Sequence, residues 1–245
     1  MNRLLSTKPI PVDERLIVAL DVPTCEAALE LVDRLGDAVR FYKVGLELLM
    51  TGDYFGLVER LKSRGKRVFV DLKFFDVPET VGRAVRVLSG KGVDFATVHG
   101  NDAILEAAVR NKGALKILAV TVLTSLDRGD LDDLGFACDI ESLVLSRARR
   151  ALELGCDGVI SSGLEVPKLR DGVDQKLIVV SPGIRPVDNR PADDQKRVVT
   201  VEQAFLNGAD YIVVGRPIRD AADPREAARS IQSQIAPLFE RPGTV

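Results

Sequence analysis

Short apolar segments alternate with longer amphipathic segments along most of the chain. The apolar segments are rich in β-branched and aromatic residues, as buried strands are. One apolar segment begins at Val68, and the extended conformation that it predicts ends before Pro78. The others span residues 16–20, 41–45, 95–99, 115–123, 158–162, 176–181 and 211–214. Between them, apolar residues recur at helical spacing in 24–35, 54–64, 79–90, 102–111, 140–154, 164–171, 201–208 and 224–238.

Residues at the ends of the amphipathic segments support the helical interpretation. Thr24 stands where an N-cap is expected, and Gly36 follows the last apolar position of the same segment. Gly65 ends the next segment in the same way. A hydroxyl before a helix and a glycine after it are typical start and stop signals.

Eight strands alternating with helices, at about thirty residues per pair, predict parallel strands joined by right-handed crossovers. The expected fold class is therefore α/β, a (β/α)₈ TIM barrel. No run rich in proline, glycine and serine divides the chain, so we expect a single domain over 1–245, with residues 1–14 as an N-terminal extension. An open, doubly wound sheet is the alternative.

The composition narrows the class of partner. Hydrophobic residues make up 46% of the 245 residues, and 34 basic residues face 36 acidic ones, so no strong field favours nucleic acid or a membrane surface. No apolar run reaches the length of a membrane span, and residues 1–12 lack the apolar core of a signal peptide. The three cysteines are scattered and not spaced as metal ligands, which favours a reducing, cytoplasmic location.

Polar residues lie at or just after the carboxyl ends of several predicted strands, which is the face where barrel enzymes build their active sites. They are Asp21, Lys43, Asp71, Lys73, Thr124 and Arg216. Asp71 and Lys73 stand two apart in a strand and should point to one face, and Asp76 adds a second carboxylate. A plain ion pair would be a weak source of stability, because desolvating both charges offsets their attraction. The cluster therefore favours a functional site.

Six motifs, in this order and spacing, closely resemble those of the orotidine 5′-phosphate decarboxylase family. They are Leu20-Asp21-Val22-Pro23, Tyr42-Lys43-Val44-Gly45, Asp71-Leu72-Lys73-Phe74-Phe75-Asp76-Val77-Pro78-Glu79-Thr80, Leu123-Thr124-Ser125, Pro182-Gly183-Ile184-Arg185-Pro186 and Val214-Gly215-Arg216-Pro217. The resemblance implies a homodimeric barrel that converts orotidine 5′-monophosphate to UMP, the last step of pyrimidine synthesis, with no metal and no cofactor.

The resemblance also implies a role for each matching residue. Lys43, Asp71, Lys73 and Asp76 would form a charged array of alternating sign, with Lys73 as the proton donor, and Asp76 and Thr80 would cross to the site of the partner subunit. Asp21 and Lys43 would hold the ribose hydroxyls, and Thr124 and Ser125 would lie at the base, with Ser125 at the pyrimidine edge. Arg185, Gln195, Gly215 and Arg216 would bind the phosphate, and the polar loop 184–196 is long enough to act as a lid.

Three other functions fit the same residues. The Asp71-Lys73-Asp76 element is shared with Mg²⁺-dependent sugar-phosphate lyases and decarboxylases of the same suprafamily. A catalytically silent barrel that binds a phosphate ligand has the same fold, since fold does not imply function. A Schiff-base aldolase would use Lys43 or Lys73.

Two further features favour structural roles. His99, the single histidine, has no cluster of metal-ligating residues beside it, so a structural role is favoured. The aspartates between Asp127 and Asp133 lack the ligand spacing of a calcium loop, so the polar segment 124–139 is expected to be a solvated loop.

Overall fold

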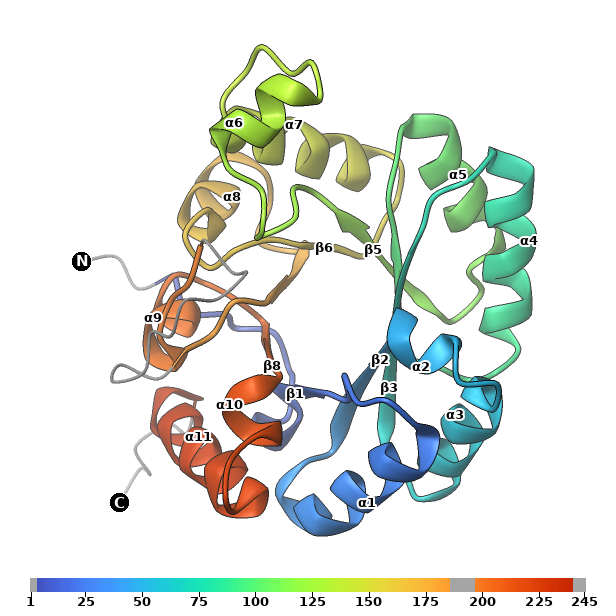
Figure 1. Ribbon diagram of the computed structural model, residues 1–245. Helices are drawn as coiled ribbons and strands as arrows, with labels where there is room; N and C mark the ends of the chain where they lie inside the picture. Colours follow the sequence, from blue (N-terminus) through green and yellow to red (C-terminus); the bar gives the residue numbers. More distant parts are fainter. Residues whose placement is uncertain (1–3, 186–196, 240–245) are drawn as a thin grey trace.

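Eight parallel strands pair in chain order and close into a barrel, because the last strand also pairs with the first. The computed structural model describes residues 4–185 and 197–239. Figure 1 shows the strands around a central axis. They are β1 (Leu16–Ala19), β2 (Phe41–Gly45), β3 (Arg67–Phe74), β4 (Phe95–Val98), β5 (Lys116–Val120), β6 (Gly158–Ile160), β7 (Ile178–Ser181) and β8 (Tyr211–Val214). The predicted TIM barrel is confirmed, and the open-sheet alternative is wrong.

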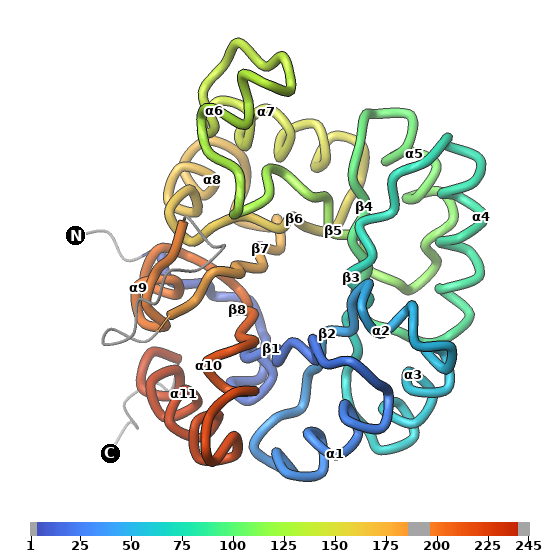
Figure 2. The backbone as a smooth tube through the Cα atoms, viewed as in Figure 1, coloured from blue at the N-terminus to red at the C-terminus, as the bar shows by residue number. Residues whose placement is uncertain are grey.

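Helices surround the barrel as an outer ring, which the backbone trace in Figure 2 follows from α1 round to α11. The longer ones are α1 (Cys25–Leu35), α3 (Tyr54–Ser63), α4 (Pro78–Ser89), α5 (Asp102–Asn111), α7 (Ile140–Glu153) and α11 (Pro224–Phe239). The shorter ones are α2 (Leu46–Leu49), α6 (Arg128–Asp133), α8 (Val166–Gly172), α9 (Val201–Leu206) and α10 (Arg216–Arg219), with 3₁₀ turns at Val12–Glu14 and Gly36–Ala38.

The expected helix signals act as predicted at α1. The Thr24 side chain accepts a hydrogen bond from the backbone N–H of Ala27, and Gly36 takes a φ of 56° after the last helical residue. That conformation lies in the left-handed region, where glycine pays no Cβ penalty.

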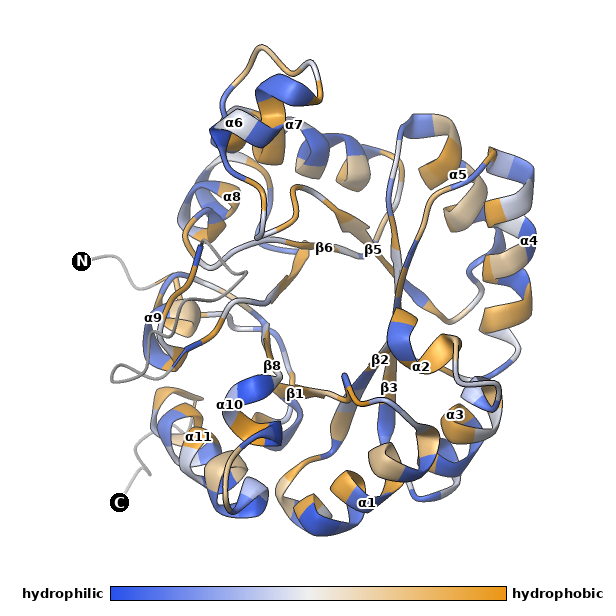
Figure 3. Ribbon diagram, viewed as in Figure 1, coloured by the Kyte–Doolittle hydropathy of each residue, from blue (hydrophilic) through white to orange (hydrophobic). Residues whose placement is uncertain are grey.

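Successive side chains along each strand point alternately to the outside and the inside of the barrel, so the hydrophobic core has two parts. One set faces the helices, whose apolar stripes are visible in Figure 3. The other set fills the barrel itself and includes Phe41, Phe69, Phe95 and Tyr211. The Phe95 ring lies 5.1 Å from that of Phe41 and 5.2 Å from that of Tyr211. This aromatic layer fills the barrel interior below the carboxyl ends of the strands.

Predicted strand 115–123 is too long, because β5 ends at Val120. Beyond it the backbone carbonyl of Thr121 accepts from Arg147, and those of Val122 and Leu123 accept from Arg197. These acceptors are satisfied by side chains instead of a strand partner, so the ladder stops. Apolar content alone did not reveal this change, since Val122 is as buried as a strand residue.

The predicted loop 124–139 is also wrong in part, because it contains α6. Asp127 accepts from the backbone N–H of Asp130, and the Asp130 side chain accepts from that of Asp127. This reciprocal capping box starts a helix that has too few apolar residues to show helical periodicity. Asp132 pairs with Arg128 on its exposed face.

Part of the N-terminal segment is anchored on the barrel. Ser6 donates to Asp210 at 2.5 Å, and Lys8 Nζ lies 3.0 Å from the same carboxylate. Asp210 is fully buried and also pairs with Arg170 at 2.8 Å. Among the helices of the described ranges, none combines the length and the apolar character needed to cross a bilayer.

Candidate active site

The polar side chains of the site follow from the two-residue repeat of the strands. Phe41 and Phe69 point into the barrel, so Lys43 and Asp71, two residues further along β2 and β3, point into it one layer higher. Thr97 stands in the same relation to Phe95 on β4. Of these residues, Lys43, Phe69 and Asp71 line a cavity of about 420 Å³ at the carboxyl ends of the strands, within the usual range for a small-molecule site.

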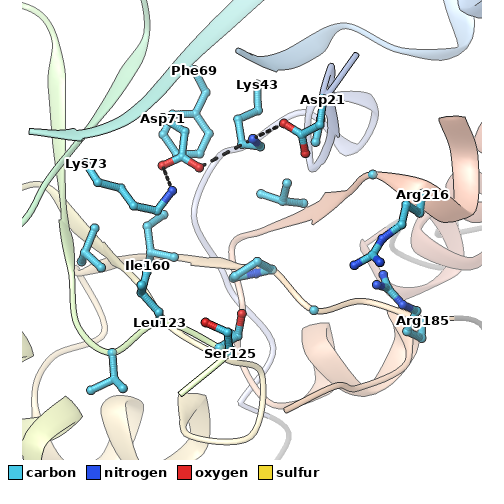
Figure 4. Close-up of a pocket in the computed structure, with 18 of the residues that line it drawn as sticks. Asp21, Lys43, Phe69, Asp71, Lys73, Leu123, Ser125, Ile160, Arg185 and Arg216 are labelled. Atoms are coloured by element: carbon cyan, nitrogen blue, oxygen red, sulfur yellow. Dashed lines mark hydrogen bonds and ion pairs between the residues drawn. The ribbon is translucent and has the colours of Figure 1, made fainter. Parts of the chain in front are cut away.

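Four charged groups of alternating sign form a row along one wall of the cavity (Figure 4). Lys43 Nζ lies 2.9 Å from Asp21 Oδ1 and 3.7 Å from Asp71 Oδ2. Lys73 Nζ lies 3.0 Å from the other oxygen, Asp71 Oδ1. The structure thus brings Lys43, Asp71 and Lys73 of the expected array together with Asp21, whereas Asp76, the fourth expected member, does not line this cavity.

Burial and neighbouring charges shift the pKa values of Lys43 and Asp71 in opposite directions. Burial alone would lower the pKa of Lys43, but the carboxylates of Asp71 and Asp21 outweigh it and raise that pKa above its usual value. Burial would likewise raise the pKa of Asp71, yet Lys43 and Lys73 hold it below its usual range. Both groups are therefore charged at neutral pH, and they place two buried, opposite charges at the centre of the row.

The backbone at Lys73 departs from a regular strand. Its φ is 48°, in the left-handed region, and the β3–β4 register shifts between Val70 and Phe74. Such a conformation at a residue with a Cβ costs roughly 1–2 kcal/mol. The freed N–H of Lys73 donates to Thr97 Oγ1 at 2.9 Å, and Thr97 Oγ1 donates to Asp71 Oδ1 at 2.8 Å. The sequence-based interpretation did not identify Thr97, since a threonine in an apolar strand looks like an ordinary strand residue.

Arginines line the side of the cavity away from Lys73. Figure 4 shows the side chains of Arg185 and Arg216 directed toward each other there, and Gly215 lies beside them in the lining. Arg219 also lines the cavity and donates to the backbone carbonyl of Asp21. It was missed by the sequence-based interpretation, although its spacing of three from Arg216 places both on one face of a helical turn.

The loop that carries Thr124 and Ser125 lines a third side of the cavity. Arg197 holds the start of this loop, because its guanidinium donates to the backbone carbonyls of Val122 and Leu123 at 3.2 and 2.9 Å. The same guanidinium pairs with Glu165 at 2.7 Å, and both side chains are almost fully buried. This ion pair links the β5–α6 loop to the segment that follows β6.

Two predicted site residues lie apart from the cavity of their own chain. Asp76 is exposed, and its carboxylate accepts from the backbone N–H of Val77. Thr80, on α4, is not in the lining. Gln195 and most of the predicted lid 184–196 lie outside the described residues.

His99 packs its ring 5.2 Å from that of Phe75. Burial, with Arg147 and Lys73 adding to it, lowers the pKa of His99, so the imidazole is neutral at pH 7. Among residues 4–185 and 197–239, no three histidine, cysteine or acidic side chains are grouped as metal ligands would be.

Comparison with known proteins agrees with the motifs. The model of the "Orotidine 5′-phosphate decarboxylase / HUMPS family" matches residues 14–231. Orotidine 5′-phosphate decarboxylase of Methylococcus capsulatus is 74% identical over 239 residues, 98% of this chain and 99% of that protein. The protein of the same name from Stenotrophomonas maltophilia is 52% identical over 236 residues, 95% of this chain and 98% of that protein.

A solved structure agrees as well. The crystal structure of orotidine 5′-phosphate decarboxylase from Lactobacillus acidophilus superposes with a TM-score of 0.80 at 35% identity, covering 91% of this chain and 99% of that one. The family match over residues 14–231 includes β2 and β3, which carry Lys43, Asp71 and Lys73. This chain therefore belongs to the orotidine 5′-phosphate decarboxylase family.

Proposed function

We propose that this chain decarboxylates orotidine 5′-monophosphate to UMP, with Lys73 as the proton donor and no metal or organic cofactor. The observation that carries the proposal is the row Asp21-Lys43-Asp71-Lys73, held at 2.9 to 3.7 Å between neighbours in a cavity at the active face of the barrel. The relatives that share most of this chain carry the name of that activity.

The chemistry explains why charges in this order are useful. Loss of CO₂ from C6 of orotate leaves an electron pair in an sp² orbital that the ring π system cannot delocalise. A fixed cation beside C6 stabilises that pair as it forms, and fixed charges in a dry site need no reorganisation during the reaction. The Lys73 ammonium then transfers a proton to C6, and its Nζ regains a proton from solvent.

Asp71 has two parts in this scheme. Its Oδ1 holds the Lys73 ammonium at 3.0 Å and orients it. Its negative charge also lies near the position that the substrate carboxylate would occupy, and that repulsion is relieved as neutral CO₂ departs. Lys43 balances the charge of Asp71 from the opposite side at 3.7 Å.

The remaining lining residues fit the other parts of the nucleotide. Asp21 and Lys43 would bind the ribose hydroxyls, and Thr124 and Ser125 would contact the base. Arg185 and Arg216, next to Gly215, would hold the phosphate, with Gln195 closing the set. Binding energy from a phosphate far from C6 can be used to order the reacting end of the substrate.

We also propose that the active form is a homodimer in which Asp76 and Thr80 complete the site of the partner subunit. Asp76 is flanked by Phe75 and Val77, whose side chains are 68% and 62% exposed. Met50, which ends the short helix α2 after the neighbouring strand β2, is 82% exposed. Exposed apolar residues on both sides of an exposed carboxylate are what a second copy of the chain would cover.

Mixing subunits tests the dimer. Lys73→Ala and Asp76→Ala chains, each inactive alone, should regain about one quarter of wild-type activity after unfolding and refolding together, because half of the dimers are hybrids with one intact site. A mixture no more active than its parents would contradict a shared site.

A cytoplasmic location is part of the proposal. Cys25, Cys138 and Cys156 are all free thiols, and two of them are buried, which suits a reducing compartment.

Product analysis tests the function itself. Purified protein incubated with orotidine 5′-monophosphate should yield UMP and CO₂ in equal amounts, identified by chromatography and by gas release. Lys73→Ala, prepared in parallel, should give neither. Binding of the nucleotide by the wild type without turnover would support the silent barrel instead.

A further inference from the structure

We infer that Thr97 is a positioning residue for the reaction, which sets the geometry between Asp71 and Lys73 through a single buried hydroxyl. The inference rests on the proposed function, because it assigns a role toward two residues of that site. Thr97 is fully buried on β4 and does not line the cavity, so it acts through its neighbours.

The direction of each hydrogen bond follows from the donors available. The backbone N–H of Lys73 can only donate, so Thr97 Oγ1 must accept from it at 2.9 Å. The hydroxyl proton then points to Asp71 Oδ1, 2.8 Å away, and that carboxylate is ionised. The hydroxyl is therefore locked in one orientation by the two groups that it joins.

These contacts form a closed ring. Lys73 is held at its backbone by Thr97 and at its ammonium by Asp71 Oδ1, and the same carboxylate oxygen is held by Thr97. The ring spans the register shift where β3 leaves its ladder with β4. Thr97 thus replaces the missing ladder partner of Lys73 and keeps its left-handed backbone in place.

A valine at this position keeps the shape of threonine and removes both hydrogen bonds. The backbone N–H of Lys73 and the carboxylate of Asp71 would then lose the hydroxyl that bonds both of them. The arginines of the cavity do not contact Thr97 and would keep their positions. We expect the kcat of Thr97→Val to fall roughly 10- to 100-fold, the scale at which small misplacements act. KM and the inhibition constant of UMP should change less than about threefold, because Thr97 touches no ligand.

The pH dependence of kcat separates a positioning role from a packing role, because loss of packing alone would not shift it. The groups that face Asp71 are Lys43 from β2, Lys73 from β3 and Thr97 from β4, with Asp21 on the far side of Lys43 and Tyr54 from α3. Without the Thr97 hydrogen bond the carboxylate is less favoured, so its pKa rises. The acid limb of the kcat profile should therefore shift to higher pH in Thr97→Val.

Thr97→Ser is the matched control. It keeps the hydroxyl and should retain kcat within about threefold of wild type, with an unshifted acid limb. Should Thr97→Val fail to fold, Thr97→Cys takes its place, since a thiol has nearly the same size and only weak hydrogen bonding. The same thresholds then apply.

Two results would overturn the inference. One is a valine or cysteine variant with kcat within twofold of wild type and an unshifted profile. The other is a serine variant as impaired as the valine variant, which would assign the effect to the methyl group. Wild-type protein that does not turn over orotidine 5′-monophosphate would instead refute the proposed function, so the two failures are distinguishable.

Discussion

Replacing Asp71 by asparagine tests the charged row at its centre. The change keeps the shape of the side chain and removes the one negative charge that lies between two ammonium groups. Lys43 would keep Asp21 at 2.9 Å, whereas Lys73 would lose the carboxylate 3.0 Å from its Nζ.

The size of the effect follows from distance and burial. At an effective dielectric constant of about 20, unit charges about 4 Å apart attract by about 4 kcal/mol, and Asp71 faces two such partners. Desolvation offsets part of this in the intact row. Removing one member of a buried pair nevertheless costs about 3–5 kcal/mol, and here two ammonium groups are affected: Lys73 loses its carboxylate partner, and Lys43 loses one of its two. Lys43 is 11% exposed at its side chain, so water replaces little of the loss.

We therefore expect Asp71→Asn to lower the free energy of unfolding by about 3–5 kcal/mol at pH 7 and kcat by at least about 100-fold. Urea unfolding followed by circular dichroism and steady-state turnover of orotidine 5′-monophosphate measure the two. Asp21→Asn is the matched control for unfolding. Asp21 is 44% exposed, and its pair should contribute about 1 kcal/mol or less.

The pH dependence of the difference has a definite sign. The pKa of Asp71 is lowered in the folded chain, so its contribution is complete above the unfolded value of about 3.9 and is lost as pH falls through the folded value. The gap in stability between wild type and Asp71→Asn should stay level near neutral pH and close below about pH 4. A variant with turnover within threefold of wild type, or a gap that does not change on acidification, would refute the reasoning.

Three further changes probe other parts of the site. Lys73→Ala should abolish turnover while UMP still binds, measured by calorimetry; turnover near the wild-type rate would remove Lys73 as the proton donor. Arg216→Ala should raise KM and lower kcat/KM for orotidine 5′-monophosphate, and wild type that used orotidine and its phosphate equally well would contradict a phosphate role. Arg197→Met leaves the buried Glu165 unpaired and should lower the free energy of unfolding in urea by about 3–5 kcal/mol; the exposed pair of Arg64 with Asp33 gives the control, at about 1 kcal/mol or less for Arg64→Met. An equal loss in both variants would contradict the importance of burial.

The barrel and the positions of Lys43, Asp71 and Lys73 at one end of it could be predicted because both follow from local patterns. Phe41 and Lys43, or Phe69 and Asp71, show the change from apolar to polar within one strand face, and parallel strands bring such positions together at one end. The six sequence motifs indicated the family, and the comparisons with known proteins confirm it.

What could not be predicted depends on contacts between distant segments or on backbone irregularity. The end of β5 is set by Arg147 and Arg197, which lie 26 and 75 residues away from the carbonyls of Thr121 and Val122. The left-handed conformation of Lys73 has no glycine or asparagine to signal it. The crossing of Asp76 and Thr80 to a partner subunit stays a prediction, as do the boundary of the N-terminal extension and the roles of the site residues.

Turnover in the presence of a chelator is the most direct test of catalysis by fixed charges. Purified protein treated with EDTA and mixed with orotidine 5′-monophosphate is followed by the loss of orotate absorbance, beside a sample supplied with Mg²⁺. We expect equal rates in the two samples. Turnover that EDTA abolishes and Mg²⁺ restores would contradict the assignment of catalysis to Lys43, Asp71 and Lys73 alone and would favour the metal-dependent lyase.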